Sequence, residues 1–320
     1  MTLRADLQEY VDQLPSSYRH AAYLMFGKME EMEKELGKPI EKFTQEELSE
    51  LLIYNTKSFS PTATTATSTI RRRSSMLNKY IAFKTGKSED QQFVACNDIV
   101  LSNSDEMASK YFKSLEEFDS IMTRTFELDK NLQFSGNLRM ALCVYLLWER
   151  NTRAQIFETK LSDIDDEHNC VNGLKIKHEK TMDLVRKVAE QEFYYTGYNQ
   201  MVTLRDGSFG SDYLITRKNA NTSFAMATFF SGLFKMIRTQ NISGTDEEKA
   251  KLTDISVNTI SKSSLFCDLK SIEIDAGSGT EIVTKQLLKM LMKQDSSNVS
   301  KGTIYNTYKD YMAWKKKYYQ

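Results

Sequence analysis

Residues that interrupt regular structure are scarce in this chain, which has only 13 glycines and three prolines among its 320 residues. Because Gly and Pro are the strongest helix breakers, this scarcity favours long helices and argues against a sheet-rich architecture. Since 40% of the residues are hydrophobic, the chain can bury a sizeable core. Its length is typical of about two domains.

Histidine and cysteine are also few. The three histidines, His20, His168 and His178, include no pair at a helical metal-binding interval, and the four cysteines lie far apart. Neither pattern is typical of a zinc site or a catalytic metal site. We therefore expect no metal or other cofactor, and we expect thiols that are kept reduced in a cytoplasm.

The sequence has no long apolar segment. The longest conspicuous apolar run, MALCVYLLW at 140–148, is far shorter than the roughly 20 residues that cross a bilayer as a helix. It predicts a buried helix and no membrane partner. Residues 1–14 carry charges throughout and lack the apolar core of a secretory signal, so we do not expect export.

Charge is balanced overall but segregated along the chain. Lysine plus arginine equals aspartate plus glutamate, 43 each, which by itself argues against a nucleic-acid partner. However, 51–88 holds seven basic residues and no acid, directly after 30–50, which holds eight glutamates and three lysines. Residues 282–320 hold eight lysines and two aspartates. Each basic segment alone is compatible with a solvated face, but two in different domains favour a clamp that neutralises phosphates on both sides of a duplex.

Helix starts and turn residues indicate how the chain is organised. Thr44, Ser114 and Thr245 are each followed three residues later by glutamate, a spacing typical of a capping box. The polar stretch 99–113 separates two helical blocks and marks a domain boundary. Turn residues with period-two character around 171–177 and 202–216 predict a small β element.

A basic helix is predicted over 69–86. Its inward stripe consists of Ile70, Leu77, Tyr80 and Ile81. The predicted outward residues are Arg72, Arg73 and Lys79.

Several segments, in this order, resemble a tyrosine recombinase or phage integrase. FTQEELSELLIYN at 43–55 and the Ser/Thr-led segment 60–87 are similar to helices of the family's core-binding domain. SLEEFDSIMTRTF at 114–126 is similar to the helix that begins the catalytic domain. VYLLWERNTRAQIFETKLSDID at 144–165 resembles the family's apolar helix, glycine-leucine-arginine turn and glutamate-led helix, and 210–235 resembles its strand, polar turn and serine-capped helix.

The resemblance implies a mainly α fold with a small β element (α+β), arranged as a two-domain C-shaped clamp. Residues 1–105 would form a helical, SAM-like core-binding domain that contacts DNA. Residues 106–320 would form a catalytic-like domain. Double-stranded DNA is the implied partner, and the protein could assemble as a homo-oligomer on repeated sites.

The family's catalytic positions are largely replaced. Family enzymes use two arginines, a lysine and histidines to bind the scissile phosphate that a tyrosine attacks, because charge gathers on the phosphate oxygens. In gap-free matches, Thr152 stands at the first arginine, Asn258 at a histidine and Ser261 at the second arginine. Asp295 stands at the other histidine, and Tyr305 alone keeps the family's nucleophile. The resemblance therefore implies a degenerate, non-catalytic member.

Other side chains near these positions are open to more than one interpretation. Arg153 would replace Thr152 after a one-residue slip and is either a DNA contact or a residue paired with Asp163 or Asp165. Lys177 or Lys180 is the nearest candidate for the family's lysine. The residues for which we predict DNA contact are Arg71, Arg72, Arg73, Lys79, Arg153, Lys180, Arg217, Lys218, Lys262, Lys301 and Tyr305.

The C-terminal segment raises the same alternatives. Tyr305, Tyr308 and Tyr311, at three-residue spacing, can share one helix face and serve packing or a phosphate hydrogen bond. Lys315–Lys317 are candidates for contact with the DNA backbone or a neighbouring subunit.

Three functions follow as hypotheses. Degenerate members of this family include phage repressors, so the first is a sequence-specific transcriptional repressor that maintains a prophage in lysogeny and associates with the bacterial nucleoid. The second is an active recombinase in which Tyr305 is the nucleophile. The third is a helical protein that binds another protein through its acidic region, 30–50.

Overall fold

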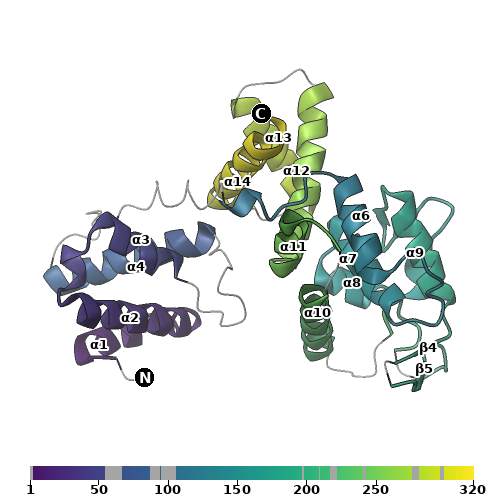
Figure 1. Cartoon of the computed structure of the whole chain (residues 1–320), viewed down its shortest axis with the longest axis horizontal. Helices are drawn as coiled ribbons and strands as arrows, with labels where there is room; N and C mark the ends of the chain where they lie inside the picture. Colours follow the sequence, from purple (N-terminus) through teal and green to yellow (C-terminus); the bar gives the residue numbers. More distant parts are fainter. Residues whose placement is uncertain are drawn as a thin grey trace. The chain divides into compact units, whose positions relative to one another are not determined.

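The computed structural model describes residues 3–54, 67–86, 94, 106–196, 198–208, 210–216, 222–240, 243–275, 281–295 and 299–320. This part of the chain is mainly helical with a small β element (Figure 1), which confirms the predicted fold class at that level. The chain divides into two compact units, Met1–Ala108 and Ser109–Gln320, which are called unit 1 and unit 2 below. The boundary predicted after residue 105 falls at the end of 95–105, a stretch outside the described residues.

Unit 1 is a helical unit with an aromatic centre. Its described elements are α1 (Ala5–Gln13), α2 (Ser16–Leu36), the 3-10 helix η1 (Ile40–Lys42), α3 (Gln45–Ile53) and α4 (Thr67–Thr85). The rings of Tyr10, Phe26 and Tyr80, from three of these helices, lie with centroids 5.1–5.7 Å apart. Such tilted and edge-on contacts are favourable aromatic geometries, so they help to hold the helices together.

Helix α4 matches the basic helix predicted over 69–86 to within two residues at its start. Its predicted inward residues, Ile70, Leu77, Tyr80 and Ile81, are at most 3% exposed. The predicted stripe is therefore confirmed.

Unit 2 contains the remaining helices and all the strands that the structure describes. They are α6 (Leu115–Phe126), α7 (Asn137–Trp148), α8 (Arg153–Glu158), η2 (Leu161–Asp163), β1 (Ile164–Asp165), β2 (Cys170–Val171), β3 (Leu174–Lys175), α9 (Glu179–Glu190), β4 (Phe193–Tyr195), β5 (Met201–Thr203), α10 (Thr222–Thr239), α11 (Asp246–Thr253), α12 (Val257–Asp275), α13 (Glu281–Asp295) and α14 (Lys301–Tyr319). Strands β1, β2 and β3 form an antiparallel sheet in that order, with Val171 opposite both Ile164 and Leu174. Strands β4 and β5 form a separate antiparallel pair.

The predicted β segments are only partly strands. The segment 171–177 contains part of β2 and all of β3, whereas 202–216 contributes only the last two residues of β5. The sequence pattern did not identify β4, whose FYY sequence does not alternate between apolar and polar residues. Its pairing with β5 instead depends on hydrogen bonds across the hairpin.

The three predicted helix starts are confirmed. The side-chain oxygens of Thr44, Ser114 and Thr245 accept hydrogen bonds from the backbone N–H three residues later, and these caps begin α3, α6 and α11. A cap of this kind satisfies an amide that has no partner within the helix.

Both tryptophans of the chain are buried in unit 2. Trp148 ends the predicted buried helix, α7, and stacks on Phe118 of α6 with ring centroids 4.3 Å apart. Trp314 of α14 donates from Nε1 to the carbonyl of Phe112 at 3.0 Å. The C-terminal helix therefore packs against the segment that precedes α6. Within the described residues, no helix is long and apolar enough to cross a bilayer.

Candidate nucleic-acid interface

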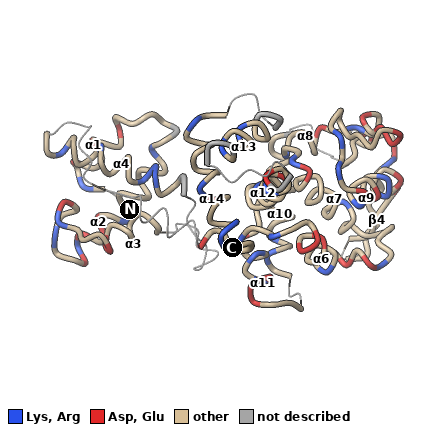
Figure 2. Tube along the Cα trace, turned by 90° about the horizontal axis from the view of Figure 1, so that it is seen from above, with Lys and Arg blue, Asp and Glu red and all other residues tan. Residues whose placement is uncertain are grey.

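Helix α4 exposes basic side chains opposite its buried stripe. Arg72 and Lys79 are exposed, and the Arg72 guanidinium lies 4.4 Å from the ring centroid of Tyr18 on α2. Arg71 is half-buried. Figure 2 marks the basic residues of this helix in blue. Arg72 and Lys79 are therefore the members of the predicted set on α4 that are placed to meet a phosphate.

The outward orientation predicted for Arg73 is wrong. Its Nη1 donates to the carbonyl of Leu52 at 2.8 Å and also to that of Tyr54, at the end of α3. Burial lowers the pKa of its guanidinium. Because these carbonyls have no partner within their own helix, Arg73 serves as a cap that fastens α3 to α4.

The acidic segment 30–50 is largely used within unit 1. Glu33, 8% exposed, accepts a hydrogen bond from the backbone N–H of Ile40 at 2.8 Å and pairs with Arg4. Glu41 pairs with Lys84 at 2.9 Å, and Glu47 caps α3 while pairing with Lys38 at 2.8 Å. These carboxylates hold helices together, so the segment offers less acidic surface to a partner than its sequence indicated.

In unit 2, the position expected for the first catalytic arginine is a helix cap. The Thr152 hydroxyl accepts from the backbone N–H of Gln155, and the Gln155 side chain accepts from the backbone N–H of Thr152. Arg150, two residues before Thr152, has a φ of 65°, in the left-handed region that glycine favours.

Arg153 is exposed at the start of α8. The two carboxylates considered as its partners are engaged elsewhere. Asp163 accepts from the backbone N–H of Lys160 at 2.7 Å, and Asp165 lies 2.8 Å from Nδ1 of His168. Arg153 therefore has no ion pair within the described part of the chain.

A polar cluster lies beside the turn between α7 and α8. Asp268 of α12 accepts from Nζ of Lys177 at 2.6 Å, and its carboxylate lies 3.3 Å from Nη2 of Arg150. Glu149 follows the last residue of α7, and its side chain, 2% exposed, lies 2.6 Å from Nδ1 of His178. Burial raises the pKa of Glu149, but hydrogen bonds from His178 and from two backbone N–H groups outweigh burial and leave that pKa below its usual value.

Lys180, predicted to contact DNA, binds residues of α6. Its Nζ lies 2.6 Å from the Asp119 carboxylate, 2.7 Å from the Thr123 hydroxyl and 5.7 Å from the ring centroid of Tyr145. These contacts fix α9 against α6 and α7, and they neutralise the charge of the lysine.

Helix α12 carries two further replaced positions. Asn258 is exposed, whereas the Ser261 hydroxyl donates to the carbonyl of Leu147 on α7 at 3.2 Å. The next residue, Lys262, binds Asp310 of α14 at 2.5 Å, and this carboxylate is almost fully buried. The structure thus brings Ser261, Lys262 and α14 together, but the lysine charge is neutralised.

Tyr305 lies on the exposed side of α14, with 43% of its surface accessible. The Nζ atoms of Lys309 and Lys285 lie 4.9 and 5.7 Å from its ring centroid. Tyr311, by contrast, is fully buried, and its hydroxyl donates to Glu273 at 2.5 Å. Of these two tyrosines of α14, Tyr311 therefore packs in the core and Tyr305 faces solvent beside lysines.

The remaining predicted positions are only partly described. Lys301 is the exposed first residue of α14. Asp295 ends α13, and its side chain lies outside the described residues, as do Arg217 and Lys218 entirely.

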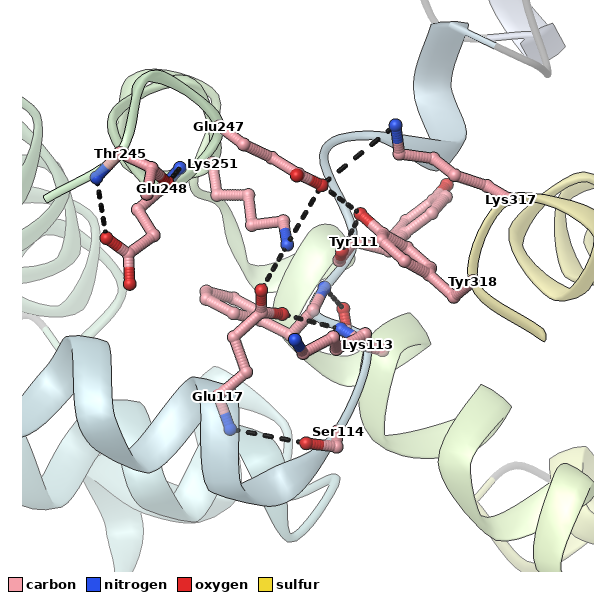
Figure 3. Close-up of polar contacts among 12 residues, drawn as sticks. Tyr111, Lys113, Ser114, Glu117, Thr245, Glu247, Glu248, Lys251, Lys317 and Tyr318 are labelled. Carbon is pink, nitrogen blue, oxygen red and sulfur yellow. Dashed lines mark hydrogen bonds and ion pairs between the residues drawn. The ribbon is translucent and has the colours of Figure 1, made fainter.

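The C-terminal lysines meet carboxylates of unit 2. Lys315 lies 2.8 Å from Glu273, and Lys317 lies 4.0 Å from Glu247. Figure 3 shows Glu247 between Lys317, the Tyr318 hydroxyl and Lys251. Two of the three lysines at 315–317 therefore lie within ion-pair distance of a carboxylate of unit 2.

Lys251 is the most deeply buried charge in that group. It is 1% exposed, and its Nζ lies 2.6 Å from Glu117 of α6 and 3.5 Å from Glu247 of α11 (Figure 3). Its Nζ also lies 5.0 Å from the ring centroid of Tyr318. This site was not predicted from the sequence. The sequence of α11, DEEKAKLT, is mostly charged and is typical of an exposed helix, so it does not indicate that Lys251 is buried.

The described residues offer no group of three or more His, Cys, Asp or Glu side chains placed to hold a metal ion. A comparison of the chain with protein-family models finds no match, and a search of curated proteins finds none either.

Proposed function

We propose that the chain is a sequence-specific DNA-binding transcriptional repressor of a temperate phage, with a two-domain tyrosine recombinase fold that has lost strand cleavage. The proposal rests mainly on what the residues at the expected phosphate-binding positions bind in the structure. Thr152 caps a helix, Ser261 bonds a backbone carbonyl, and Lys262 is neutralised by Asp310. Phosphoryl transfer needs pre-organised positive donors, and these residues supply none.

The chain can bind DNA without cleaving it, because binding does not need the catalytic residues. Phosphate contacts need only accessible basic side chains, which position a protein on a duplex, while base contacts provide specificity. Arg72 and Lys79 on α4 and Arg153 on α8 are exposed. The left-handed φ of Arg150, at the position of the family's glycine, supports the match on which the proposed fold depends.

A gel-shift experiment with fragments of phage DNA tests the proposal. We expect retarded bands with a subset of fragments, and we expect them to weaken steeply as salt rises. The charge reversal Arg72→Glu/Lys79→Glu should abolish the shift, whereas the reversal Lys34→Glu/Lys42→Glu, at exposed lysines of unit 1, should preserve it. A wild-type protein that retards no fragment at low salt would contradict the proposal.

An active recombinase is the second candidate, and the exposure of Tyr305 beside Lys285 and Lys309 favours it. A nicked suicide substrate separates the two functions. The repressor proposal predicts no covalent protein–DNA complex. A trapped complex that disappears in Tyr305→Phe would make the protein an enzyme.

A further inference from the structure

An arginine is buried without a carboxylate in unit 2. Arg139 of α7 is 8% exposed, and its Nη2 donates to the carbonyl of Thr216 at 2.8 Å. Its Nε is buried and meets no acceptor, and its guanidinium lies 5.6 Å from the ring centroid of Tyr194. No described carboxylate forms an ion pair with it. Burying an uncompensated charge is costly, so this arrangement favours an anion from outside the chain.

A second guanidinium, that of Arg205, lies near Arg139 but is held by acceptors of the chain itself. Arg205 donates to the Thr216 hydroxyl at 3.1 Å and to the carbonyls of Ser211 and Tyr213 at 2.8 and 2.7 Å. It likewise forms no ion pair with a described carboxylate. Burial, and then the nearby Arg139, lower the pKa of Arg205, and the charge of Asp212 offsets part of this change. Two like charges thus share Thr216.

Arg139 lines an open pocket of about 460 Å³. This volume lies within the range of roughly 300–1,000 Å³ that small-molecule sites occupy. The other walls are mainly apolar or aromatic, and they include Met140, Tyr194, Val202 and Phe229. The pocket thus joins one cationic group to an apolar surface, from α7, the β4–β5 pair and α10.

We propose that this pocket binds a small carboxylate that carries an apolar or aromatic group. The carboxylate would accept a hydrogen bond from the Arg139 guanidinium, and the apolar group would contact Met140 and Phe229. A monoanion suits the site because a single guanidinium lines the pocket, whereas a phosphate dianion would call for several donors. The inference does not depend on DNA binding.

Binding of 4-phenylbutyrate to the full chain, followed by ligand-observed NMR and by the melting temperature, tests this proposal. The neutral 4-phenylbutanamide, which has the same apolar group, is the control ligand. We expect saturable binding of the acid and a rise in melting temperature, with the amide at least ~10-fold weaker because it lacks the charge-assisted hydrogen bond.

Arg139→Gln should weaken binding of the acid at least ~10-fold and bring it close to that of the amide. Arg238→Gln is the matched control, because Arg238 also donates to a carbonyl and lies over an aromatic ring but is not among the pocket residues. If Arg139→Gln does not fold, Phe229→Ala should weaken binding of acid and amide alike. Equal binding of acid and amide by the wild type, or no saturable binding at millimolar concentrations, would overturn the proposal.

Discussion

Two basic helices, α4 in unit 1 and α14 in unit 2, use their charges differently. On α4, Arg72 and Lys79 are exposed. On α14, Lys315 binds the buried carboxylate of Glu273, and the neighbouring Lys262 binds Asp310 of α14 itself. A count of lysines along the sequence therefore overstates the charge that the C-terminal segment offers to DNA.

The difference has a physical cause. A carboxylate that is nearly excluded from water is stable only if a cation or hydrogen-bond donors accompany it. Glu273 and Asp310 are 5% and 4% exposed, so nearby lysines are needed as their partners. On helix α4, Lys84 likewise pairs with Glu41, but Arg72 and Lys79 stay exposed.

The strongest test concerns Lys251, whose charge is the most completely enclosed. Lys251→Met keeps most of the side-chain volume but leaves Glu117 without its cation, so we expect a loss of about 3 kcal/mol in the free energy of unfolding. Lys249→Met, on the exposed side of the same helix, should change it by less than about 0.5 kcal/mol. Urea denaturation measures both, and equal effects would contradict the contrast between enclosed and exposed lysines.

The pair of Glu149 and His178, whose side chains are 2% and 25% exposed, extends the comparison to a histidine partner. His178→Ala removes a donor to this charged group and should lower stability by about 2 kcal/mol. Because the pKa of Glu149 is lower in the folded chain than its usual value, its contribution is present above about pH 4.3 and is lost as pH falls through the folded pKa. In urea titrations between pH 3 and pH 7, the variant should therefore lose less stability on acidification than the wild type.

Substitutions at the exposed basic residues of α4 should change the affinity for DNA and leave the stability of the fold unchanged. Arg72→Ala/Lys79→Ala should weaken binding roughly tenfold at moderate salt and reduce the slope of log K against log salt by about two, if each contacts one phosphate. Lys315→Met should leave that slope unchanged and lower the melting temperature. The reverse result would show that the C-terminal lysines carry the DNA contacts.

The smallest change in stability is expected from substitutions at Thr152. Thr152→Ala removes the cap of α8 and should lower stability by about 1 kcal/mol, whereas Thr152→Ser should retain most of it. Thermal unfolding distinguishes the two. A loss of DNA binding without a loss of stability would instead indicate that the hydroxyl contacts a phosphate.

Features that depend on neighbours in the sequence were predictable. The caps at Thr44, Ser114 and Thr245, and the buried stripe of α4, follow from local spacing. The orientation of Arg73 was not predictable in this way, because its acceptor at Leu52 lies 21 residues earlier.

The candidate site depends more on distant pairs. Lys262 and Asp310 are separated by 48 residues, and Lys251 and Glu117 by 134. Local periodicity carries no information about which carboxylate a lysine will meet. The left-handed Arg150 was also missed, since its residue type gives no indication of that backbone conformation.

The placement of both tryptophans in unit 2 has an optical consequence. Trp148 and Trp314 are buried there, whereas the aromatic centre of unit 1 consists of tyrosine and phenylalanine. Indole emission will therefore report the unfolding of unit 2 alone, while far-ultraviolet circular dichroism records the helices of both units. If the two signals change at different denaturant concentrations, the units unfold separately, and the spectra assign each transition to its unit without any added label.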